Sequence, residues 1–176
     1  GINAGINDLK TKNDAKYLYT LCDFSGDVCY SKVVTPINEI SSVTFRTRGM
    51  TALYRAICET LDLLDERVLA NEKVLINIYT DGQDNASGNH TSTAPERIKQ
   101  AQNKGYTITF IGTEKDVNTM VNTMHLDKSN TLAYDGSAQG LQKSLHLNSI
   151  ARSNYSASVA NGLDVSKGFY KEVVKK

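Results

Sequence analysis

The spacing of apolar residues along the chain predicts alternating helices and strands. Ile2, Ile6 and Leu9 recur at helical spacing, so the chain is expected to open within a helix whose last turn contains Lys10. Two runs rich in β-branched and aromatic residues then flank a turn of Asp, Ser and Gly residues, which predicts a β-hairpin over residues 17–34.

The rest of the chain continues this alternation. Further strands are expected at residues 73–80, 106–111 and 131–134. Helices are expected around residues 53–64, from a capping box at 93–96 to Gly105, around 117–124 and around 141–150. This order predicts an α/β fold: a Rossmann-like, mostly parallel sheet with one antiparallel edge strand and helices on both faces.

The patterning weakens after about Ser153, where the chain becomes polar. We therefore expect one domain over residues 1–150 and a C-terminal extension or strap over residues 151–176. Phe169 and Tyr170 are the apolar side chains that would anchor this strap to the domain.

The composition narrows the classes of protein to which this chain could belong. The 176 residues have a formal net charge of +1, which offers no basic field for nucleic acid, and no apolar run is long enough to cross a membrane. The three cysteines, Cys22, Cys29 and Cys58, follow no zinc-binding spacing. They are interpreted as reduced thiols, which favours a cytoplasmic location.

Two polar junctions carry the candidate chemistry. Thr51 lies where a loop enters a helix, and Asp81 follows a buried strand. In open α/β sheets ligands bind outside the carboxyl ends of the strands, and hard divalent cations prefer carboxylate and hydroxyl oxygens. Thr51 and Asp81 are therefore candidate metal ligands, although two ligands are too few to hold a metal alone.

The motifs around these residues resemble a known family. Residues 49–57 read Gly-x-Thr-x-Leu-x-x-Ala-Ile, and residues 80–85 read Thr-Asp-Gly-x-x-Asn. In this order they resemble the second and third elements of the metal-ion-dependent adhesion site of von Willebrand factor A (vWA) domains. Residues 22–25 and 106–112 are similar to that family's hairpin turn and next core strand, so the resemblance covers roughly residues 1–150.

The resemblance implies a non-enzymatic protein-interaction module. Mg²⁺ or Mn²⁺ would be held by Thr51 and Asp81, together with Asp and Ser residues of a leading element, and would take an Asp or Glu carboxylate from a partner protein. Residues expected to support the site without binding the metal are Gly49, Gly82, Asp84, Asn85 and Ser25. Within the family, the chain is most similar to short cytoplasmic bacterial and phage members.

The family's leading element, Asp-x-Ser-x-Ser at the end of a first strand, is missing. Asp23-x-Ser25-x-Asp27 imitates it but occupies the position of the hairpin turn, too close to Thr51. Without that element the metal site of this chain is incomplete, and metal occupancy stays open. Our hypothesis is that further N-terminal residues, or a strand exchanged from another chain, fill the sheet between the hairpin and strand 73–80. The oligomeric state is left open.

Several alternatives stay open. Asp81-Gly82 could be a plain turn, and Thr51 a helix cap. A metal-dependent hydrolase would need Asp84 or Asp23 as its general base, and a structural or assembly protein could retain a vestigial metal site. A calcium loop of the EF-hand type fails, because the sequence from Asp81 lacks the Gly and Glu that such a loop requires.

Overall fold

A computed structural model describes residues 2–12, 14–44, 49–80 and 82–174. The elements are α1 (Ile2–Thr11), β1 (Leu18–Phe24), β2 (Val28–Pro36), η1 (Ile37–Glu39), α2 (Leu53–Arg67), β3 (Leu75–Tyr79), α3 (His90–Asn103), β4 (Thr107–Thr113), α4 (Glu114–Asn122), η2 (Lys128–Asn130), β5 (Thr131–Tyr134), α5 (Ala138–Ala160) and α6 (Lys171–Val174). The predicted α/β class is confirmed, and each predicted strand and helix is present.

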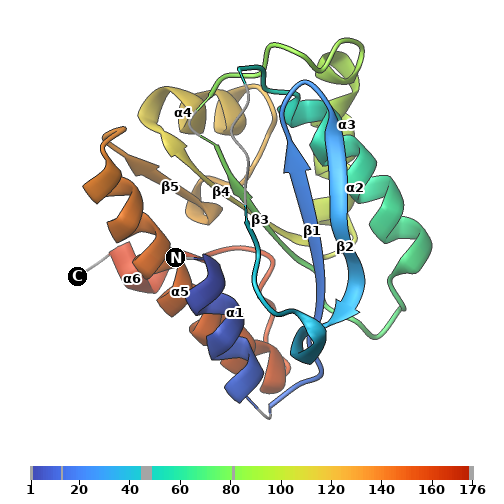
Figure 1. Ribbon diagram of the computed structural model, residues 1–176, viewed down its shortest axis with the longest axis vertical. Helices are drawn as coiled ribbons and strands as arrows, with labels where there is room; N and C mark the ends of the chain where they lie inside the picture. The colour runs from blue at the N-terminus through green and yellow to red at the C-terminus, as the bar shows by residue number, and fades with distance from the viewer. Residues whose placement is uncertain (1, 13, 45–48, 81, 175–176) are drawn as a thin grey trace.

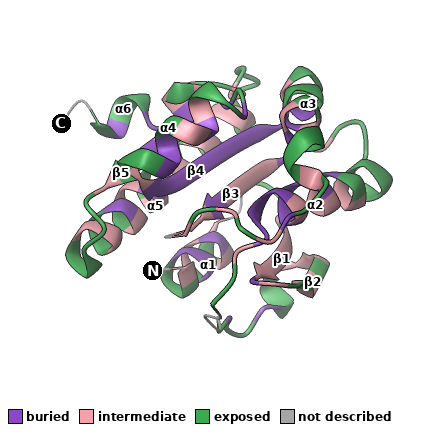
Figure 2. Ribbon diagram, turned by 90° about the horizontal axis from the view of Figure 1, so that it is seen from above, coloured by how far each residue is buried: buried purple, intermediate pink, exposed green. Residues whose placement is uncertain are grey.

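The strands form one layer between two layers of helices (Figures 1 and 2). β3, β4 and β5 make a parallel sheet with β4 in the middle, and β1 and β2 make an antiparallel hairpin. Helices α2, α3 and α4 cover one face, while α1 and α5 cover the other. Parallel strands buried on both faces suit this arrangement, and six of the seven residues of β4 are buried.

The sheet differs from the prediction in one respect. A single mostly parallel sheet was expected, but among the described residues β1 bonds only to β2, and β3 bonds to β4 alone. The reason is that no described segment supplies backbone hydrogen bonds between β1 and β3. The hairpin and the parallel sheet are therefore separate sheets that lie in the same layer.

The core follows the alternation of side chains along β4. Ile108 and Phe110 pack in a cluster with α2, α3 and α4, whereas Ile111 packs in a second cluster with α5 and the C-terminal strap. A third cluster joins α1 to the hairpin through Ile6 and Ile40, both almost fully buried. The two faces of the strand layer are thus covered by separate apolar clusters.

The predicted start of α3 is wrong. The helix begins at His90, so residues 93–96 lie inside it and do not form a capping box. Tight turns bring the chain into the helix early, because the backbone N–H of His90 donates to Ser87 O and that of Thr91 donates to Gly88 O. A capping box does occur, at the start of α4, between Thr113 and Asp116.

The C-terminal part first continues helix α5 and then turns back to the sheet (Figure 1). Helix α5 continues to Ala160, so the domain boundary predicted at residue 150 falls within this helix. The following strap returns to the sheet and buries Phe169 and Tyr170. Asn130, itself fully buried, accepts a hydrogen bond from Phe169 N and donates one to Ser166 O. None of the described helices is both long and apolar enough to span a bilayer.

Candidate functional site

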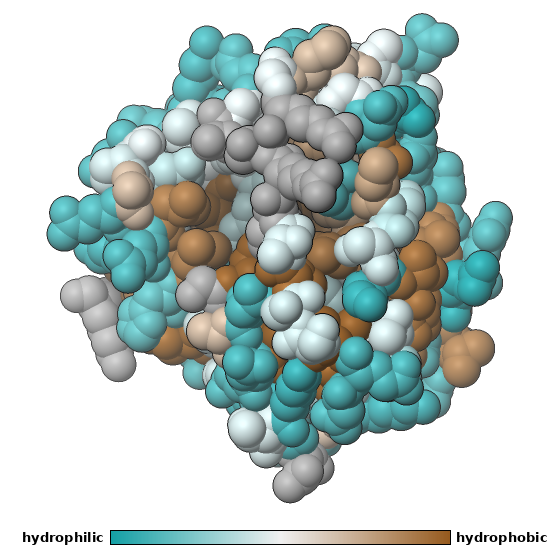
Figure 3. Space-filling model, in the orientation of Figure 1, coloured by the Kyte–Doolittle hydropathy of each residue, from teal (hydrophilic) through white to brown (hydrophobic). Residues whose placement is uncertain are grey.

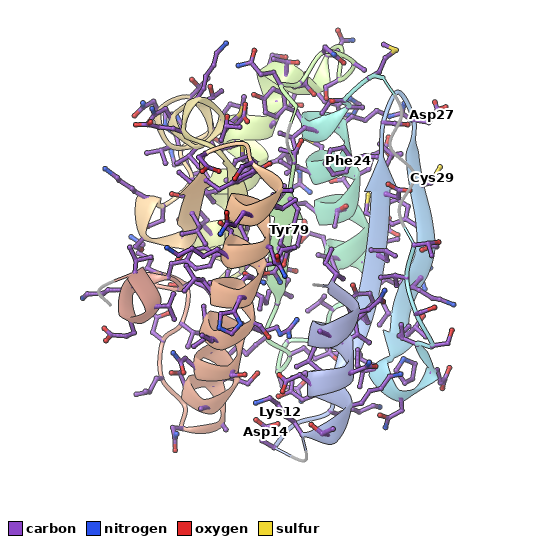
Figure 4. The ribbon with its side chains drawn as sticks, turned by 60° about the vertical axis from the view of Figure 1, so that its left-hand side comes forward. Lys12, Asp14, Phe24, Asp27, Cys29 and Tyr79 are labelled. Atoms are coloured by element: carbon purple, nitrogen blue, oxygen red, sulfur yellow. The ribbon has the colours of Figure 1, made fainter. Side chains whose placement is uncertain are left out.

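The hairpin turn and the start of α2 are joined at the carboxyl edge of the strand layer. The backbone N–H of Ala52 donates to Ser25 O at 2.6 Å, and a Cβ atom added at Gly26 would be in van der Waals contact with the side chain of Met50. Asp27 of this turn lies at the opposite end of the molecule from Lys12 and Asp14, which follow α1 (Figure 4). Ser25 and the residues before α2 therefore meet at the edge where the sequence predicted them.

Two hydrogen bonds hold Thr51 and Asn85 together, one of them to the side chain of Asn85. The N–H of Thr51 donates to Asn85 Oδ1 at 2.7 Å, and the N–H of Asn85 donates to Thr51 O at 2.9 Å. The N–H of Ala86 donates to the same carbonyl. These bonds bring the loop after β3 against the loop before α2, so Asn85 positions Thr51.

Gly82 gives the Thr51 hydroxyl room beside the end of β3. A Cβ atom added at Gly82 would lie 2.9 Å from Thr51 Oγ1, which is closer than real Cβ atoms come to other atoms. The Thr80 hydroxyl donates to Gly82 O and accepts from Gly82 N, which fixes the turn. The Thr51 hydroxyl makes no hydrogen bond with another described residue. Asp81, the predicted carboxylate ligand, lies outside the described residues.

Asp84 caps helix α2 from a different loop. The first N–H groups of a helix have no intrahelical partners, and Ala52, the N-cap residue of α2, has no side chain that could accept from them. Asp84 Oδ1 accepts from Tyr54 N at 3.3 Å and from the Ser87 hydroxyl, and Ser87 Oγ accepts from Arg55 N at 2.9 Å. Thr51 is therefore not the cap of α2. The carboxylate of Asp84 is already engaged in hydrogen bonds to Tyr54 N and the Ser87 hydroxyl.

The site borders a small polar cavity of about 260 Å³. Tyr54, Gly82, Asp84 and Asp116 contribute to its lining. Burial, together with the two nearby carboxylates, raises the pKa of Tyr54. Asp116 and Ser87 were not predicted to belong to this site. The Thr-x-x-Asp spacing at residues 113–116 and the Asp-x-x-Ser spacing at 84–87 are the signals that could have found them.

The described residues fit a metal site only in part. Within the described ranges, which leave out Asp81, no group of three or more His, Cys, Asp or Glu side chains could hold a metal. The described part of this edge supplies one oxygen ligand that a metal could use, the hydroxyl of Thr51 beside the end of β3. Gly49 stands two residues before it, with open space where a side chain would be.

Comparison of the chain with protein-family models, curated proteins and solved structures found no match. The vWA resemblance therefore rests on the motifs and their placement in the fold.

Proposed function

We propose that this domain is a protein-interaction module of vWA type that binds a partner's carboxylate through Mg²⁺ or Mn²⁺. The observation that supports the proposal best is the approach of the Thr51 hydroxyl to Gly82, at the edge where the hairpin turn and both loops converge. A divalent cation prefers such oxygen ligands when rigid elements hold them.

Each residue of this edge has a distinct part in the proposal. Thr51 and Asp81 would be the metal ligands that this chain supplies, and the family's leading element would supply the others. A bound cation would provide the positive charge that attracts an Asp or Glu side chain of the partner. Asn85 holds the backbone of Thr51, and Gly82 keeps the space beside its hydroxyl open.

The engagement of Asp84 favours binding over catalysis. A hydrolase at this edge would need a carboxylate that is free to take a proton from water. Asp84 instead accepts hydrogen bonds from Tyr54 N, at the start of α2, and from the Ser87 hydroxyl, whose oxygen in turn accepts from Arg55 N. We therefore place the interaction module ahead of a hydrolase that would use Asp84 as its general base.

A titration with Mn²⁺, followed by NMR, tests the metal-binding half of the proposal. Paramagnetic broadening detects weak binding, which suits a site with few ligands. We expect substoichiometric Mn²⁺ to broaden the amide signals of Thr51 and Gly82 first, and this selectivity to be lost in Thr51→Val. The matched control is Thr91→Val, which changes an exposed threonine at the start of α3. Uniform broadening, or broadening first at another site, would contradict the proposal.

The carboxylate-binding half is tested with sodium acetate in the same samples. We expect the relaxation rate of the acetate methyl protons to rise above that of the same Mn²⁺ concentration without protein. Thr51→Val should return the rate to the protein-free value. If acetate relaxation does not respond to the protein while Mn²⁺ binds at Thr51, the edge binds metal but not a partner carboxylate.

A further inference from the structure

The cavity next to Thr51 and Gly82 has an acidic lining. It lies between the start of α2, the loop after β3 and helix α4, and its volume is about 260 Å³. Among the described residues that line it, only Asp84 and Asp116 carry charge, and both are acidic. Two carboxylates without a neighbouring cation attract a ligand of positive charge.

Each of these carboxylates has one oxygen without a hydrogen-bond partner among the described residues. Asp84 accepts from Tyr54 N and from the Ser87 hydroxyl, in both cases through Oδ1. Asp116 accepts from the backbone N–H and from the hydroxyl of Thr113, in both cases through Oδ2. Asp84 Oδ2 and Asp116 Oδ1 are therefore available to a ligand.

The hydroxyl of Tyr54 is a third oxygen at this cavity. Tyr54 is only 7% exposed, yet its hydroxyl makes no hydrogen bond with another described residue. Burial raises the pKa of Tyr54, and the charges of Asp84 and Asp116 raise it further, so the hydroxyl lies near both carboxylates. Buried tyrosine hydroxyls normally have a hydrogen-bond partner, and a ligand in the cavity would provide one.

The cavity leads from the surface into the core. Gln83 on its wall is exposed and Thr119 is half-buried, whereas Phe110 and Met120 are fully buried. An alkyl chain can therefore lie against the apolar part of the wall while its charged end reaches the buried Asp116. The volume is below the roughly 300–1,000 Å³ of sites for drug-sized ligands, which suits a single side chain.

We propose that this cavity binds the ammonium group of a lysine side chain from a partner protein. An ammonium group has three N–H donors, which match Asp84 Oδ2, Asp116 Oδ1 and the Tyr54 hydroxyl. A guanidinium group suits the cavity less well, because it prefers both oxygens of one carboxylate and each carboxylate here offers one. A divalent cation requires about six oxygen ligands, whereas part of this wall is apolar.

The cavity and the proposed metal edge share Gly82. This residue lines the cavity and also lies against the Thr51 hydroxyl. A partner with a lysine close to its Asp or Glu would reach both sites, and this extension rests on the proposed function. The lysine site itself needs no metal. Binding measured in EDTA therefore separates its failure from failure of the metal proposal.

An NMR titration in EDTA with blocked lysine, N-acetyl-lysine methylamide, tests the proposal on the 176-residue chain. We expect saturable shifts, first of the amide signals of Asp116 and Thr119. Blocked norleucine has the same carbon chain without the ammonium group and should bind at least about tenfold more weakly, because the charge-assisted hydrogen bonds are lost. This comparison is needed because apolar surface is also exposed elsewhere, as in the middle of the face in Figure 3, where an alkyl chain can bind without a charge.

Two variants locate the binding site. Asp116→Asn can still accept from Thr113 through its amide oxygen, but it places an NH₂ group at the position of Oδ1. We expect it to weaken the binding of blocked lysine at least about tenfold, and Tyr54→Phe, which keeps the ring, to weaken it severalfold. The matched control is Asp127→Asn, which removes the same charge from a carboxylate bonded to Ser129 and should leave binding unchanged.

Other outcomes would overturn the proposal. If blocked lysine causes no saturable shift, the cavity has no ammonium site, and equal binding of blocked norleucine would show that charge plays no part. Full affinity in both Asp116→Asn and Tyr54→Phe would place the ligand elsewhere. Tighter binding of blocked arginine would make guanidinium the recognised group. Much tighter binding of putrescine would identify a free diamine, and not a partner's side chain, as the ligand.

Discussion

At the scale of single residues, Gly82 decides how close the Thr51 hydroxyl comes to the end of β3. The hydroxyl is at the end of a short side chain that can rotate about one bond, whereas the backbone of Gly82 is fixed by Thr80. A methyl group at position 82 would therefore displace the hydroxyl and leave the backbone in place.

This difference gives a prediction for a pair of glycine variants. Gly82→Ala should weaken Mn²⁺ binding at least severalfold while changing the free energy of unfolding by less than about 1 kcal/mol, because a threonine rotamer can adapt. Gly49→Ala is the matched control, since its Cβ would meet no atom within 4 Å. Both quantities are measurable on the same samples, by Mn²⁺ titration and urea unfolding. Equal affinity of the two variants would show that the Thr51–Gly82 approach is irrelevant to the metal.

The placement of Thr51, Gly82, Asn85 and Ser25 could be predicted from the sequence, because residues that follow parallel strands meet at one edge. The role of Asp84 could not. Asp84 caps helix α2, which begins more than two dozen residues earlier in the chain. The sequence around Ala52 contains no local pattern that indicates which residue accepts hydrogen bonds from the first N–H groups of α2. Helix capping between distant loops depends on how those loops fold together.

At the scale of elements, α2 and α3 are joined by a cluster around Asp65. Lys104 Nζ lies 2.8 Å from its carboxylate, Arg97 Nη2 lies 3.3 Å away, and the Tyr106 hydroxyl donates to it. Burial raises the pKa of Asp65, but the hydrogen bonds and charges of Lys104 and Arg97 outweigh it and leave the pKa below its ordinary value of 3.8.

The lowered pKa of Asp65 predicts how stability depends on pH. The folded state favours the ionised form, so its contribution is present above pH 3.8 and is lost as the pH falls through the lower pKa of the folded state. Asp65→Asn should therefore cost less stability at pH 2 than at pH 7, by a difference below about 1 kcal/mol because the carboxylate is partly exposed. Urea unfolding at both values measures this. Glu66→Gln, at an exposed position of the same helix, is the control, and an equal cost of Asp65→Asn at both values would contradict the prediction.

At the scale of the whole molecule, α5 and the strap after it close one face of the sheet with polar contacts. Asn148 donates to the Tyr79 hydroxyl and accepts from that of Tyr170, both at 2.6 Å, and so joins β3, α5 and the strap. The buried positions of α5 are Ser144, Asn148, Ala151 and Ser156. These residues have helical spacing but little apolar character, which is why hydrophobic periodicity stopped short of the end of the helix. The apolar anchors Phe169 and Tyr170 were recognisable because they are the only aromatic residues after Tyr155.

The division of the strand layer into two sheets could not be predicted from hydrophobic periodicity either. Apolar patterning identifies strands, but it does not report which strands pair. We claim above all that, within the described part of the chain, the hairpin and the parallel sheet face each other across two edges without a strand partner. The way the strand ends converge at Thr51 depends on this arrangement.

Amide hydrogen exchange of the 176-residue chain, resolved residue by residue along β3, tests this claim most directly. The account predicts an alternation: the amides of Ile76 and Ile78, bonded to β4, exchange slowly, and those of Leu75, Asn77 and Tyr79 exchange at least about tenfold faster, because no strand among the described residues bonds to them. Equally strong protection of all five amides would contradict the account, since β3 would then be paired on both sides.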